Sequence, residues 1–287
     1  MKRVAIIMAV MGMCVGGWAQ DKPAAQSPAG QSSGQAAGQA AAPQGKRAPK
    51  INSQDEYKAY QAAVAITDPA ESEKAANDFA AKYPSSEVRA VVYRTTMERY
   101  EQANQLEKAV EVAKKVLAID PDDPEALVAV AQVDAEQAKD DALDKDERLA
   151  AAKKGAERAL ETIETDVPTS GYTPEQINAY KSFWRSQAYF VLGTAAFKAS
   201  NWPEAEKNFR KSIDAMPQQP DVVAVYRLAL ALDFQNKIPE AIKAAQQAVD
   251  LTKDNPDSAA GKAARQELDR LNKYAPGTSG QSAPPKS

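Results

Sequence analysis

Three short turns of the same kind recur along this chain and constrain its fold more than any other feature. Each turn has a small polar residue where one helix must end, then an apolar residue, then an alanine that begins the buried face of the next helix. The polar residues are Asn104, Ser200 and Asn236. Asparagine suits this place because it tolerates the left-handed backbone conformation that ends helices. Since 36 residues separate Ala205 from Ala241, the fixed period predicts a stacked solenoid.

Prolines and glycines divide the region between residues 51 and 274 into helices. Its glycines are Gly155, Gly171, Gly193 and Gly261, and no run of residues alternates like a strand. Prolines stand where helices should begin or end, as at Pro174, where Thr173 and Gln176 can form a capping box. Ser53 and Glu56 predict a second capping box. We expect about eleven helices, the longest starting at Pro174, and therefore an all-α fold.

The repeated units resemble the tetratricopeptide repeat family. The best unit is identified by Tyr189, Leu192, Gly193, Ala205, Phe209 and Pro217, an earlier one by Tyr93, Tyr100 and Ala109, and a later one by Ala229 and Ala241. The resemblance spans about residues 53–254 and implies a right-handed solenoid of helix–turn–helix repeats, closed by a C-terminal capping helix at 256–274. Small residues at the family positions predict places where two helices cross at short distance.

The two ends of the chain differ in composition from the middle. A basic start at Lys2 and Arg3, an apolar run from Val4 to Val15 and a small residue at Ala19 predict a signal peptide over residues 1–19. We therefore expect export to the periplasm or secretion; the alternative is an inner-membrane anchor formed by an uncleaved segment. Residues 20–50 and 275–287, rich in Ala, Gln, Pro, Gly and Ser, are expected to be disordered, which leaves residues 51–274 as the helical domain.

Composition excludes several classes of function. The chain has no histidine and one cysteine, Cys14, which argues against histidine-dependent catalysis, soft-metal sites and disulfides. A formal charge of −3 and a pI of about 5.4 provide no basic surface for nucleic acid. We interpret the acidic run 120–125 as a turn in which Asp123 caps a helix, and the acidic run 140–147 as a solvated insertion. No catalytic residue, cofactor or metal is predicted.

The family resemblance implies a non-enzymatic binding scaffold of the cell envelope, whose concave groove is lined by the first helix of each unit. Transferred by position, the groove would present Arg94, Glu98, Val128, Gln132, Phe190, Thr194, Tyr226 and Leu230 to a peptide or partner helix, with Tyr189 and Leu228 in the core. The alternative is a self-assembling protein, a homo-oligomer that uses its convex face or terminal helix. Phe183 and Trp184 either pack on the preceding insertion or form an exposed anchor for a partner.

Overall fold

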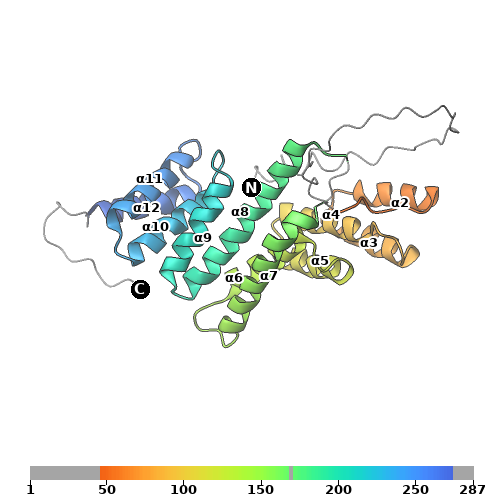
Figure 1. Ribbon diagram of the computed structural model, residues 1–287, viewed down its shortest axis with the longest axis horizontal. Coiled ribbons are helices and arrows are strands. Elements are labelled where there is room, and N and C mark those ends of the chain that lie inside the picture. The colour runs from red at the N-terminus through yellow and green to blue at the C-terminus, as the bar shows by residue number, and fades with distance from the viewer. Residues whose placement is uncertain (1–45, 168–170, 274–287) are drawn as a thin grey trace, which may run out of the picture.

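A computed structural model of the chain describes residues 46–167 and 171–273, and within these ranges it consists of α-helices without a β-strand. The helices follow one another along the long axis of the molecule (Figure 1). They are α2 (Gln54–Val64), α3 (Pro69–Lys82), α4 (Arg89–Gln102), α5 (Leu106–Ile119), α6 (Pro124–Gln137), α7 (Lys145–Thr165), α8 (Pro174–Lys198), α9 (Trp202–Ala215), α10 (Val222–Phe234), α11 (Ile238–Leu251) and α12 (Ala259–Lys273). The predicted signal peptide, most of the predicted linker and the C-terminal tail lie outside the described residues.

Each first helix packs against the second helix that follows it, in the pairs α2–α3, α4–α5, α6–α7, α8–α9 and α10–α11, and α12 covers α11. Each second helix also packs against the next first helix, so the units stack into one solenoid. This arrangement confirms the predicted all-α repeat fold and its C-terminal capping helix. None of the helices in the described ranges is both long enough and apolar enough to span a bilayer.

The turns within the units have the backbone conformation that the sequence predicts. Asn104, Ser200 and Asn236 have φ angles of 57°, 58° and 60°, and no other described non-glycine residue has a positive φ. Each lies directly after a first helix and reverses the chain into the second helix. Between α6 and α7 this tight turn is replaced by the loop 138–144, where Leu143 is fully exposed, in keeping with the predicted insertion.

Helices are in tight contact at small residues that the sequence predicts as crossings. A Cβ atom added at Gly193 would lie 2.6 Å from two ring carbons of Phe209, which is itself fully buried. Most predicted repeat positions are buried, namely Tyr93, Tyr100, Ala109, Gly193, Ala205, Phe209, Ala229 and Ala241, whereas Leu192 is partly buried and Pro217 is exposed in a turn. The first helices therefore sit at distances set by these contacts.

The helix starts differ from the prediction in one detail. Thr173 and Gln176 form the predicted capping box at α8. At α2 the Ser53 side chain accepts a hydrogen bond from the Glu56 N–H, but the Glu56 carboxylate accepts from the N–H of Asn52 instead of Ser53. The second capping box is therefore incomplete, because the Glu56 carboxylate bonds to the residue before the N-cap.

The predicted boundary of the disordered linker at Lys50 is wrong. Lys46 and Arg47 lie against the folded units and form ion pairs with carboxylates of their turns. Composition could not indicate this, because the residues that hold the segment are far away in the sequence.

Gly193→Ala should destabilise the fold by about 1–3 kcal/mol, because the added methyl group overlaps the Phe209 ring at a crossing that cannot widen freely. Chemical denaturation measures the effect. Gly155→Ala is the matched control, since its new Cβ would approach no atom closer than the Ala131 methyl carbon at 3.1 Å. Adding Phe209→Leu to Gly193→Ala should recover part of the loss; strictly additive changes would contradict a direct clash.

Candidate functional site

The first helices lie next to one another along one side of the solenoid. Besides their own partners, α2 packs on α4, α6 on α8 and α8 on α10. We call this side the first-helix face. All the residues predicted to form the groove lie on helices of this face, but its N-terminal and C-terminal halves differ in their side-chain contacts.

In the N-terminal half, Arg94 of α4 holds a group of acidic side chains together. Its Nη1 atom donates to Oδ2 of Asp123 over 2.9 Å, and its Nε atom lies 3.7 Å from Oε1 of Glu125. The Tyr180 hydroxyl of α8 donates to the same Glu125 oxygen over 2.7 Å. Asp123 also caps α6, as predicted, by accepting from the Ala126 N–H. Three successive units thus contribute to one polar group.

Two further carboxylates of α4, Glu98 and Glu101, complete this group. Both are partly buried, and no described basic side chain lies within ion-pair distance of either. We call Arg94, Glu98, Glu101, Asp123, Glu125 and Tyr180 the Arg94 cluster. It contains four carboxylates and one guanidinium, so it holds an excess of acidic groups.

Burial is the main reason why three carboxyl groups of the cluster have raised pKa values. It raises the pKa of Glu98 to about 7, that of Glu101 to about 7 and that of Glu125 to about 8. Arg94 works against this shift in Glu98 and Glu125, while the charge of Glu125 adds to the shift in Glu101. For Arg94 itself burial opposes the charge, but Asp123 and Glu125 keep its pKa well above the ordinary value. The cluster therefore gains negative charge as the pH rises past neutrality.

One tyrosine belongs to the cluster and a second borders it. Tyr180 of α8 is buried against Glu125 of α6. Tyr60 of α2 is partly buried, and its pKa is raised by burial and lowered by the nearby charge of Arg94. Phenol rings beside carboxylates provide both apolar surface and a face that attracts cations.

In the C-terminal half, the predicted groove is covered by an ion pair. Arg227 of α10 lies 5.0 Å above the ring of Phe190, donates to Thr194 Oγ1 over 2.6 Å and pairs with Glu136 of α6 over 2.7 Å. Phe190 and Thr194 are 7% and 2% exposed. Arg227 thus ties three first helices together above residues that were expected to be open.

The prediction that Val128, Phe190 and Thr194 line an open groove is therefore wrong, since all three are buried. Tyr189, expected in the core, is instead partly exposed with the Lys211 ammonium 4.9 Å from its ring centre. Neighbouring residues on a helix point about 100° apart, so the rotation of α8 that buries Phe190 turns Tyr189 towards the surface.

The remaining predicted groove residues keep some exposure. Arg94, Glu98, Gln132, Tyr226 and Leu230 are partly buried on α4, α6 and α10, and Leu228 lies in the core as predicted. The structure brings Arg94 and Glu98 together in one cluster, but no described contact joins them to Tyr226 or Leu230.

Of the two alternatives for Phe183 and Trp184, the structure favours packing. Trp184 is 6% exposed and makes edge-to-face contacts with Phe183 and Tyr180, with ring centres 5.0 Å and 6.3 Å away. Trp184 belongs to the apolar core that α6, α7 and α8 form and Phe183 packs against it, so the pair is not an exposed anchor.

Sequence reasoning missed Glu101, Glu125, Tyr180 and Arg227. Each looks like an ordinary exposed residue of a helix when its own segment is considered. Only Arg94 and Glu98, four residues apart on one helix face, gave a local signal of a charged pair. The partners on other units could not be identified without the stacking.

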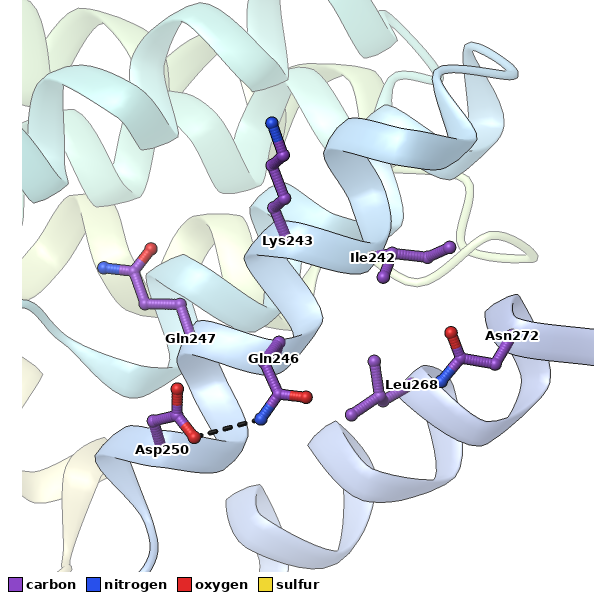
Figure 2. A pocket seen from close by; sticks show the side chains of 7 residues that line it. All are labelled: Ile242, Lys243, Gln246, Gln247, Asp250, Leu268 and Asn272. Atoms are coloured by element: carbon purple, nitrogen blue, oxygen red, sulfur yellow. Dashed lines mark hydrogen bonds between the residues drawn. The ribbon is translucent and has the colours of Figure 1, made fainter. Parts of the chain in front are cut away.

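Two pockets lie away from the Arg94 cluster. The first, of 380 Å³, opens between α11 and α12, where Ile242 and Leu268 face the gap and Gln246 donates to Asp250 over 3.0 Å (Figure 2). The second, of 540 Å³, lies between α7, α8 and α9 over Leu149 and Leu192. Among the described residues no group of His, Cys, Asp and Glu side chains is arranged to hold a metal ion.

Comparison with known proteins identifies one repeat by its sequence. Residues 90–133, which contain all of α4 but its first residue, all of α5 and most of α6, match a family model described as a tetratricopeptide repeat. A search of curated proteins found no match to the chain.

Several solved structures resemble the chain in part. One is YrrB, described as a tetratricopeptide-repeat protein with an unusual peptide-binding site, which is 16% identical with a TM-score of 0.39 over 66% of this chain and 87% of that one. Another is MamA from Desulfovibrio magneticus RS-1, at 15% identity and a TM-score of 0.42 over 70% and 96%. The chaperone Acl4 is 12% identical with a TM-score of 0.37 over 78% and 99%.

The raised pKa values predict how stability changes with pH. Between pH of about 5 and 8 the folded protein keeps protons on Glu98, Glu101 and Glu125 that the unfolded chain has already lost. The folded state therefore binds more protons, and its free energy of unfolding should fall as the pH rises through this window. Urea denaturation of the wild type at pH 5.5 and 8.5 measures the fall.

Two glutamine variants test whether the pH dependence of stability comes from the cluster or from the rest of the surface. Glu98→Gln should flatten the pH dependence, because it removes one of the buried ionisable groups. Glu111→Gln, which changes an exposed residue of α5, should leave it as in the wild type. Equal slopes in the two variants would show that the cluster does not control the pH response.

Proposed function

We propose that this chain, in which residues 90–133 form a tetratricopeptide repeat, is a non-enzymatic scaffold that binds a peptide or helix of a partner protein on its first-helix face. The Arg94 cluster is the observation that supports this most. Arg94 pairs with Asp123 and Glu125 and acts electrostatically on Glu98, while Glu101 feels the charge of Glu125, on the side of the solenoid that first helices form. Such an arrangement is costly for the chain alone, because buried charges need partners.

The excess of carboxylates specifies the chemistry of the partner. A lysine or arginine side chain placed near Glu98 and Glu101 would supply the positive charge that the described residues do not provide there. The partly exposed ring of Tyr60 would contact its aliphatic part and attract its charge. The partner segment is therefore basic, and it binds at the N-terminal half because Arg227 already covers Phe190 and Thr194 in the C-terminal half.

We also propose that the protein is exported and acts in the cell envelope or outside the cell. The support is the order of a basic start at Lys2 and Arg3, an apolar run from Val4 to Val15, and Ala19. N-terminal sequencing of protein isolated from the envelope tests this: a start at Gln20 is expected, and an intact Met1 would favour the membrane-anchored alternative.

A pair of labelled peptides tests the binding function. At pH 8 and low salt, a fluorescein-labelled octapeptide of alternating lysine and alanine should bind, and one of alternating glutamate and alanine should not. Glu98→Gln should weaken binding of the lysine peptide about fivefold to tenfold, the loss expected for one partly desolvated ion pair. Fluorescence anisotropy measures both constants.

Glu111→Gln is the control in this experiment, because it removes the same charge from an exposed site outside the cluster. If Glu98→Gln and Glu111→Gln bind the lysine peptide equally, attraction comes from the overall charge and the groove hypothesis is wrong. Equal binding of both peptides would contradict the proposed partner chemistry.

Self-assembly is the second candidate, and the pocket between α11 and α12 favours it. Leu268 and Ile242 expose an apolar gap at the end of the solenoid, where a further helix could continue the stack (Figure 2). Light scattering over a range of concentrations tests it: the mass should rise with concentration, and Leu268→Asp should remove the rise. A constant monomer mass would eliminate this candidate.

A further inference from the structure

Residues 46–50, which we call the strap, bind along an edge formed by the turns between units. The Lys46 N–H donates to the carbonyl oxygen of Val167 over 3.1 Å. Its ammonium group donates to the Asp120 carboxylate and, over 2.8 Å, to Oδ2 of Asp166. One lysine thus connects the ends of α5 and α7.

Arg47 and Lys50 attach the strap to a third turn. The Arg47 guanidinium donates twice to the Glu87 carboxylate, over 2.7 and 2.8 Å, and the Lys50 N–H donates to the same group over 2.8 Å. These hydrogen bonds lower the pKa of Glu87 to about 2, and the bond from Arg47 contributes most to the shift. Glu87 lies between α3 and α4, so the strap crosses the same kind of turn in three consecutive units.

The anchoring carboxylates lie beside the Arg94 cluster. Asp120 and Asp123 belong to one turn, in which the Asp123 N–H donates to the Asp120 carbonyl oxygen over 3.2 Å. The pKa of Asp166 is raised first by burial and also by the charges of Asp120 and Asp123, whereas Lys46 lowers it. The Lys46 ammonium therefore partly neutralises the acidic surface that borders the proposed binding site.

We propose that the strap is an internal competitor, a basic extended segment whose Lys46 and Arg47 occupy the acidic edge that a basic partner peptide would use on entering the Arg94 cluster. This inference rests on the proposed function, because it gives that site a regulation. The partner's own lysines or arginines would pair with Asp120 and Asp166 when the strap leaves.

The strength of the strap contacts suits an exchangeable segment. Arg47 and Glu87 are well exposed, whereas the Lys46, Asp120 and Asp166 side chains are 35%, 21% and 18% exposed. An exposed ion pair such as Arg47–Glu87 is weak and screened by salt, so this end of the strap can open. Tethering, in turn, gives the strap a millimolar effective concentration without strong contacts. A weak tethered ligand reduces the affinity for a competitor without blocking it.

A purely structural strap would behave differently. If it only stapled the units, its loss would lower stability and leave peptide affinity unchanged or reduced. A competitor instead predicts that removing its charges increases the affinity for a basic peptide. The two roles therefore differ in the sign of the binding change.

The test uses the full chain with Lys46→Ala and Arg47→Ala together. The control is Lys58→Ala with Lys74→Ala, which removes two charges from exposed sites on α2 and α3. The lysine–alanine octapeptide should bind the strap variant about fivefold or more tightly than the control and the wild type. Circular dichroism shows whether both variants keep the helices.

Each possible result of this binding experiment either supports or overturns the competitor role. Equal or weaker binding by the strap variant, in a wild type whose binding depends on Glu98, would overturn the competitor role and leave the proposed function in place. If neither the wild type nor the strap variant binds the lysine peptide, both proposals are wrong. A gain that the Lys58 and Lys74 control shares would attribute the effect to overall charge and also overturn the competitor role.

Discussion

The close contact of paired helices at small residues is the constraint on which the rest of the structure depends. Gly193 lets α8 approach the ring of Phe209, and small buried residues also lie in the helix pairs at Ala205 of α9 and Ala241 of α11. Packing at this density fixes the spacing and rotation of the units. Only with that spacing do α4, α6 and α8 come close enough for Arg94, Glu125 and Tyr180 to share one cluster.

Local signals predicted the fold better than the site. Asn104 and Ser200 marked turns by a property of their own backbone, and Gly193 marked a crossing by its size, so one sequence sufficed. Phe190 was misplaced because the family pattern does not fix helix rotation to one residue. Glu125 and Lys46 were missed because their partners lie on other units, which local sequence cannot identify.

The electrostatics divide the first-helix face into a closed half and an open one. In the closed half, Arg227 pairs with Glu136, donates to Thr194 and covers the Phe190 ring. Its charge and the apolar ring are therefore both in contact with other residues of the chain. In the open half the cluster has one arginine and four carboxylates. The positive charge of Lys46, at the edge of the cluster, partly offsets this excess of acidic groups. The same chemistry, a basic group on acidic turns, thus connects the strap with the expected partner.

Hydrogen exchange of backbone amides, with and without the lysine–alanine peptide, tests most directly whether the open half is the binding surface. If the open half binds the peptide, exchange should slow in α4, in the first turn of α6 and in the N-terminal half of α8, and should become faster at residues 46–50 as the strap is displaced. Protection confined to α11 and α12, or to α7 and α9, would place the peptide at a pocket and contradict binding at the open half.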